Sequence, residues 1–228
     1  AGVEERIEIL DLLIGHNREA AWPVLIHLLP ESAGSISMPT HRPYWRDWAN
    51  DWRKGATRAD SLAFITAVAE RLIHQAGQNA QRWKNLFENI GAIPYPARDQ
   101  FIHAAISFSQ NALADQDRRV LNEALREQIN RHRAFPDSNW SLPAEALGQL
   151  AVVAANLEPK DVVLRHAWLF EAYPDRYFDG SSDWRENEKR LDEARRAAIS
   201  DILEDQGYAG IEVLIENAAS PSHVGCYL

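Results

Sequence analysis

Apolar side chains recur at steps of three and four residues along most of this chain, and glycine and proline interrupt the runs. Val3, Ile7 and Leu10 begin one such run, and Ile65 and Leu72 belong to another. Because an α-helix turns once every 3.6 residues, this spacing gathers the apolar groups on one face. Alternating runs on either side of an Asn-Gly or Asp-Gly turn, which would indicate β-hairpins, do not occur. The sequence therefore predicts an all-α fold.

The first and the last predicted helix pairs share one design. Residues 3–14 and 17–29 form the first pair, with Gly15 in the link, and residues 183–206 and 210–219 form the last, with Gly207 in the link. Stacked antiparallel pairs of this kind build α-solenoids. Because no repeat of fixed period is present, we expect an irregular, HEAT-like array or a single multi-helix domain that covers residues 1–228.

Several helix boundaries can be predicted from individual residues. Asn17 is a good N-cap for the second helix, and Pro96 suits the first turn of a later one. Asp115 or Asp117 is expected to cap a helix, and so is Ser141. Residues 162–164 are rich in valine, as strands are, but the apolar run continues past them to residue 170. That run is too long for a typical strand, so it favours a helix.

The charge and the cysteine content restrict the class of protein. The net charge is −9, which disfavours general binding to nucleic acid, because neutralising phosphates dominates that affinity. Cys226 is the single cysteine, so a disulfide framework within the chain is impossible and a cytoplasmic location is expected. No apolar run approaches the length of a membrane span. The chain begins without methionine and stops within an apolar run, so we expect it to be a fragment of a longer protein.

Four short patterns carry a resemblance to a known class of protein. They are Ala-Trp-Pro-Val-Leu-Ile-His-Leu-Leu-Pro at 21–30, Pro-Thr-His-Arg-Pro-Tyr-Trp-Arg-Asp-Trp at 39–48, His-Arg-Ala-Phe-Pro-Asp-Ser-Asn-Trp-Ser-Leu-Pro at 132–143 and Arg-His-Ala-Trp-Leu-Phe at 165–170. Together they resemble the helical C-terminal regions of large bacterial multidomain proteins that are linked to NTPase modules and phage defence. The resemblance implies a scaffold or sensor segment whose active domain lies elsewhere.

Residues 40–58 combine aromatic and basic side chains more densely than any other stretch. Trp45, Trp48 and Trp52 would share one face of a helix. Such a face suits stacking against single-stranded nucleic acid, a nucleotide base or a partner helix. Alternatively, the tryptophans fill the core between neighbouring helices, since Trp is mostly buried in proteins. The candidate ligand or partner surface contains His41, Arg42, Tyr44, Trp45, Arg46, Trp48, Trp52 and Arg53.

Neither a metal site nor a catalytic motif is predicted. The eight histidines form no His-x3-His pair and no His-Glu-x-x-His motif, and Cys-x-x-Cys is absent. Phosphate loops and Gly-x-Ser-x-Gly are absent as well. We therefore expect no metal, no cofactor and no catalytic residue.

The sequence favours a non-catalytic helical scaffold or sensor module. Its expected partner is another protein or another domain of the same polypeptide. Two alternatives stay open: binding of nucleic acid or nucleotide through residues 40–58, and an all-helical enzyme with a dispersed site.

Overall fold

The structure is a computed structural model that describes residues 2–30, 57–171 and 184–228. These ranges are predominantly helical and contain no β-strand, which confirms the all-α prediction. The chain divides into two compact units, residues 1–104 and residues 105–228, and the division falls inside helix α5 (Tyr95–Ser109). The single domain over 1–228 stays a prediction.

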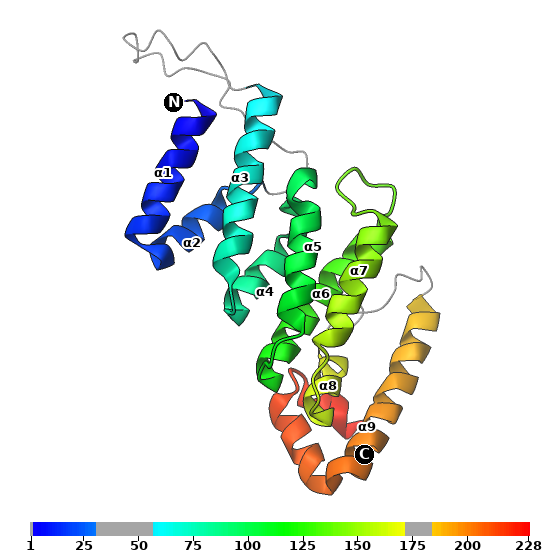
Figure 1. Cartoon of the computed structure of the whole chain (residues 1–228). Helices are drawn as coiled ribbons and strands as arrows, with labels where there is room; N and C mark the ends of the chain where they lie inside the picture. The colour runs from blue at the N-terminus through cyan, green and yellow to red at the C-terminus, as the bar shows by residue number, and fades with distance from the viewer. Residues whose placement is uncertain (1, 31–56, 172–183) are drawn as a thin grey trace, which may run out of the picture. The chain divides into compact units, whose positions relative to one another are not determined.

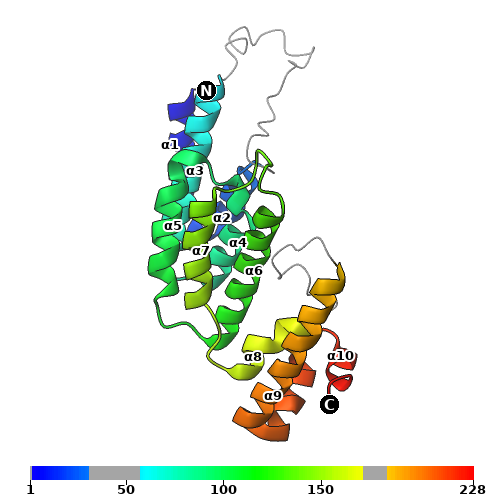
Figure 2. The ribbon, with the colours of Figure 1, turned by 90° about the vertical axis from the view of Figure 1, so that its right-hand side faces the viewer.

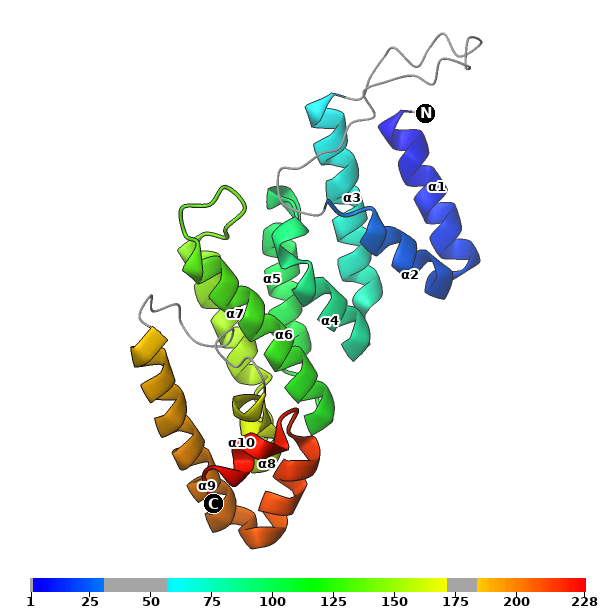
Figure 3. The same cartoon turned by 180° about the vertical axis from the view of Figure 1, so that it is seen from behind.

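The first unit stacks its helices in two layers. Figures 1 and 3 show α1 and α3 side by side in one layer, with α2 and α4 crossing on the other side. The helix α1 stands at the edge of its layer, with α3 on one side only. The elements of this unit are α1 (Val3–His16), α2 (Arg18–His27), α3 (Arg58–Ala76), α4 (Ala80–Glu88), the 3-10 helix η2 (Ile90–Ala92) and the first part of α5.

Three of these helices begin at a residue whose side chain caps the first turn. The Asn17 carboxamide accepts a hydrogen bond from the Ala20 amide at 3.0 Å, which confirms the predicted cap of α2. Asn79 caps α4 in the same way. Thr57 and Asp60 form a reciprocal capping box at the start of α3. These caps bind amide groups that the first turn of a helix leaves without partners.

Three aromatic rings occupy the core of the first unit. The centroids of Trp83 and Phe87 lie 5.8 Å apart, and Phe101 of α5 lies 6.1 Å from Trp83 and 6.3 Å from Phe87. All three side chains are buried. The cluster joins α4 to α5, and its tilted and edge-on ring contacts are the arrangements that aromatic pairs prefer.

The second unit packs a helix pair and a group of C-terminal helices. The helices α6 and α7 contact each other along their length, and α8, η3 and α10 pack on α9 (Figure 2). The elements of this unit, after the end of α5, are α6 (Asp115–Ala134), α7 (Ala144–Asn156), α8 (Val162–His166), the 3-10 helix η3 (Ala167–Phe170), α9 (Trp184–Asn217) and α10 (Pro221–Gly225).

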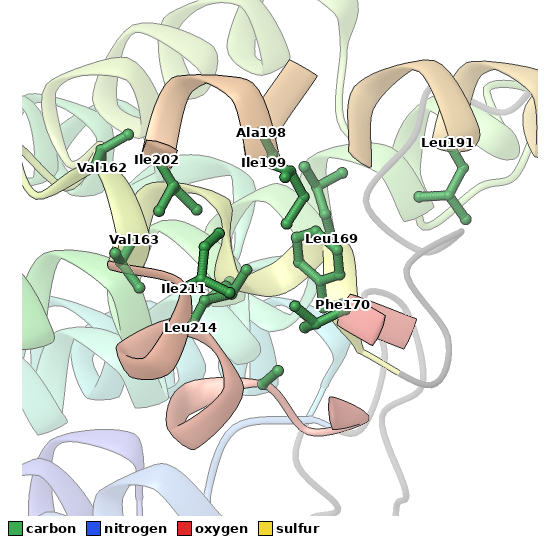
Figure 4. Packing of buried hydrophobic residues seen from close by; sticks show 13 residues of the cluster. Val162, Val163, Leu169, Phe170, Leu191, Ala198, Ile199, Ile202, Ile211 and Leu214 are labelled. Carbon is green, nitrogen blue, oxygen red and sulfur yellow. The ribbon is translucent and has the colours of Figure 1, made fainter. Parts of the chain in front are cut away.

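One apolar cluster holds the C-terminal helices together. Figure 4 shows Phe170 and Leu169 of η3 facing Ile199 of α9, with Val163 of α8 near Ile211. All five side chains are buried. Residues 162–170 therefore form short helices whose apolar side chains enter this cluster, as predicted, and they are not a strand.

Two predicted N-caps are wrong because their side chains bind elsewhere. Ala114, rather than Asp115 or Asp117, precedes α6, and the Asp115 carboxylate accepts from the amide of Asp161 at 2.8 Å. Pro143, rather than Ser141, precedes α7, and the Ser141 hydroxyl donates to the carbonyl of His132 at 2.8 Å. Asp115 thus links α6 to the start of α8, 46 residues away, whereas Ser141 binds the end of α6, nine residues away.

Gly207 breaks α9 into two arms, as the sequence predicts. Its φ is 64° and its ψ is −153°, a conformation that essentially only glycine adopts. Figures 1 and 3 show the helix turning back at this end of the unit. The turn brings Ile211 and Leu214 of the second arm into the apolar cluster.

We expect Gly207→Ala to lower the free energy of unfolding by about 1–3 kcal/mol, because alanine must adopt a strained backbone conformation there. Gly148→Ala is the matched control, since Gly148 lies inside α7 and an added Cβ meets no atom within 4 Å. This control should raise the free energy of unfolding by up to about 1 kcal/mol through helix propensity. Urea denaturation followed by circular dichroism measures both, and equal stabilisation by the two substitutions would contradict the strained turn.

Candidate functional site

The predicted aromatic and basic surface lies outside the described residues. This applies to all eight of its members, His41, Arg42, Tyr44, Trp45, Arg46, Trp48, Trp52 and Arg53. The nucleic-acid alternative, which depends on these residues, therefore stays a prediction. The candidate site must be sought among the side chains that the structure describes.

The side of α1 that faces away from α3 carries exposed apolar side chains. Leu10 is buried and Ile7 is partly buried, so these residues face the rest of the unit. Ile9 is 59% exposed and Leu12 is 73% exposed. A single exposed leucine is ordinary, but two such residues one turn apart form a contiguous apolar surface on one helix.

We define the outer face of α1 by four exposed residues that share one side of the helix: Glu5, Ile9, Leu12 and His16. At 100° per residue they fall within an arc of about 60°. Glu8 is also exposed and lies about 40° outside this arc, next to Leu12. The outer face therefore combines an apolar centre with carboxylates toward the N-terminal end.

An ion pair fixes α1 against α3. Arg71 donates from Nε to Asp11 Oδ1 and from Nη2 to Asp11 Oδ2, both at 2.7 Å. This two-bond geometry holds the pKa of the Asp11 carboxyl below its ordinary value. Asp11 lies on the flank that faces α3, so the pair agrees with the rotation of α1 that buries Leu10.

A second candidate is a hollow of about 400 Å³ at the start of α9. Arg195 is 9% exposed, and its Nε donates to the carbonyl of Leu169 at 2.8 Å. Its guanidinium also lies 5.8 Å from the ring centroid of Tyr227. Hydrogen bonds from Arg196 and Tyr227 hold the pKa of Asp192 below its ordinary value. Cations and carboxylates line this hollow together, and their contacts tie α9 to η3 and to the C-terminal residues, which is a structural role.

His166 and Asp201 form a third candidate, a pair linking α8 to α9. The Nε2 atom of His166 lies 3.2 Å from Oδ2 of Asp201. Burial lowers the pKa of His166 below its ordinary value, while the carboxylate of Asp201 opposes that shift. The pair joins the two helices near the surface, where the Asp201 side chain is 57% exposed.

The described residues contain no group of three or more His, Cys, Asp or Glu side chains that could hold a metal ion. In the same ranges, no helix is long and apolar enough to cross a membrane. No protein-family model, curated protein or solved structure shows significant similarity to the chain. The resemblance to bacterial multidomain proteins stays a prediction, and function has to be argued from the geometry.

The sequence does contain a signal for the outer face of α1. The signal is the number of apolar residues in this helix rather than a motif. The first helix has more apolar residues than one face can hold: Leu10 is buried, and Val3, Ile7, Leu13 and Ile14 are partly buried. The remaining pair, Ile9 and Leu12, must then point elsewhere. Which side of the helix would be covered could not be derived, because that depends on where α2 and α3 pack.

We expect Asp11→Asn to lower the free energy of unfolding at pH 7 by up to about 1 kcal/mol, the range for an exposed pair. Because folding lowers the pKa of Asp11, the ionised form stabilises the fold, and this contribution disappears as the pH falls through the folded-state pKa. The difference from the unsubstituted chain should therefore shrink below pH 3.8, the ordinary pKa. Denaturation with urea at several pH values tests this, with Asp205→Asn in an exposed part of α9 as the control.

Proposed function

We propose that this chain is a non-catalytic helical scaffold that binds another protein, or another part of its own polypeptide, through the outer face of α1. The observation that carries the proposal is the exposure of Ile9 and Leu12, which lie on the side of α1 opposite to the buried Leu10. Apolar side chains grouped on one surface and bordered by charged residues are typical of protein interaction sites.

The titratable groups support a structural rather than a catalytic role. Catalytic sites collect groups whose pKa values are shifted by burial and by neighbouring charges. Here the pKa of Asp11 is lowered by Arg71, that of Asp60 by the helix cap with Thr57, and that of Asp192 chiefly by Arg196. Each of these three causes is an ion pair or a cap that also stabilises the helices. Burial lowers the pKa of His166, whose partner Asp201 joins α8 to α9.

The proposed location is the cytoplasm. Cys226 is exposed and makes no disulfide. An exposed free thiol fits a reducing compartment.

A photo-reactive benzoylphenylalanine in place of Leu12 should form a covalent adduct with one protein segment in the cells that produce this protein. Mass spectrometry of the adduct identifies the segment. Adding Ile9→Asp should reduce the yield at least about tenfold, because a carboxylate then stands where the partner would bury the apolar Ile9 side chain.

The matched control places the same photo-reactive residue at Val152 of α7, which is 55% exposed. Its adducts should be few and should not respond to Ile9→Asp. Equal yields at the two positions would contradict the scaffold function, and so would adducts with nucleic acid alone.

A further inference from the structure

The outer face of α1 has the residue spacing of a helix–helix contact. Its apolar centre, Ile9 and Leu12, lies one turn apart on the same side, which is the spacing that helices use to contact each other. The opposite side of α1 already packs on a helix, α3. A helix placed on the outer face would therefore continue the layer that α1 and α3 form (Figure 3).

The charge around the apolar centre is negative. Glu4, Glu5 and Glu8 are exposed on α1, and Arg6 is the one exposed arginine or lysine of this helix. The carboxylate of Asp11 is already bound by Arg71. Two carboxylates lie on or beside the outer face. Glu5, which accepts a hydrogen bond from the Gly2 amide at 2.9 Å, is one turn before Ile9, and Glu8 is one turn before Leu12. A partner helix would therefore meet an acidic border at one end of the apolar surface.

This charge distinguishes between possible occupants. A second copy of α1 would bring its own carboxylates to the contact, and close like charges oppose association. An amphipathic helix with lysine or arginine beside its apolar stripe would instead gain opposite-charge contacts with Glu5 and Glu8. Such a helix also covers the exposed Ile9 and Leu12, which supplies the larger part of the affinity.

We propose that the outer face of α1 binds a basic amphipathic helix of another protein, a proposal that rests on the scaffold function given above. The apolar stripe of that helix covers Ile9 and Leu12. Its lysine or arginine side chains lie next to Glu5 and Glu8. The apolar contact sets the strength of binding, and the acidic border selects basic over acidic helices.

Two synthetic helices of about 20 residues test this proposal by fluorescence anisotropy against the 228-residue chain. Both peptides have leucine at steps of three and four residues; one carries lysine at the flanking positions and the other carries glutamate there. The lysine peptide should bind at least about tenfold more tightly than the glutamate peptide, and the preference should decrease with salt.

Substitutions on the outer face distinguish binding at this site from non-specific electrostatic attraction between a basic peptide and an acidic chain. Ile9→Asp should weaken binding of the lysine peptide at least about tenfold. Glu8→Lys should weaken it about threefold and strengthen binding of the glutamate peptide. The matched controls are Val152→Asp in α7 and Glu204→Lys in α9, both at exposed positions, and they should change neither affinity.

Equal affinities of the two peptides, or no binding of either, would overturn the proposal. A loss with Val152→Asp as large as that with Ile9→Asp would overturn it too, because binding would then not depend on α1. The cross-linking experiment at position 12 distinguishes failure of this proposal from failure of the scaffold function. A protein adduct there, together with no charge preference between the peptides, supports a scaffold whose partner is not a basic helix.

Discussion

An amphipathic helix is stable in water only when another element covers its apolar stripe. In the first unit α3 meets this requirement for its neighbours: it packs on α1, α2 and α4 and contributes Val68 and Leu72 to the core. In the second unit the first and second arms of α9 cover η3 and α8. Phe170 is completely buried in the apolar cluster that these elements form. At α1 the requirement is met on one side only, since Ile9 and Leu12 lie outside the stripe that α2 and α3 cover. The proposed function depends on that difference.

The polar contacts support the same arrangement. Arg71 holds Asp11 in the first unit, and Arg195 binds the carbonyl of Leu169 in the second. Each arginine joins two helical segments through hydrogen bonds and so fixes how one helix is rotated against another. The exposed pair of Arg71 with Asp11 contributes little free energy. In α1 the burial of Leu10 leaves Leu12 pointing outward, and the Arg71–Asp11 pair agrees with that rotation.

Much of the fold could be predicted from the sequence because it depends on local properties. The three-to-four-residue spacing predicted helices, Asn17 predicted a cap, and Gly207 predicted a break in α9. The caps proposed at Asp115 and Ser141 were wrong because each side chain binds a group outside the helix that it was expected to cap, which local rules do not describe. The candidate surface at residues 40–58 lies outside the described residues, so its role stays a prediction. The outer face of α1 was missed because exposure is a property of packing, and the sequence alone does not say which of two apolar sides is covered.

Thiol labelling measures whether Leu12 is accessible in the folded chain, as the proposed binding surface requires. The test uses Leu12→Cys and, for comparison, Leu10→Cys, each in a chain that also carries Cys226→Ser. Leu12 is 73% exposed and Leu10 is 5% exposed, although both lie on α1. We predict that the thiol at position 12 reacts nearly as fast as in urea, whereas the thiol at position 10 is protected at least about tenfold. Equal protection at the two positions would refute the proposed binding surface, because the outer face of α1 would then already be covered.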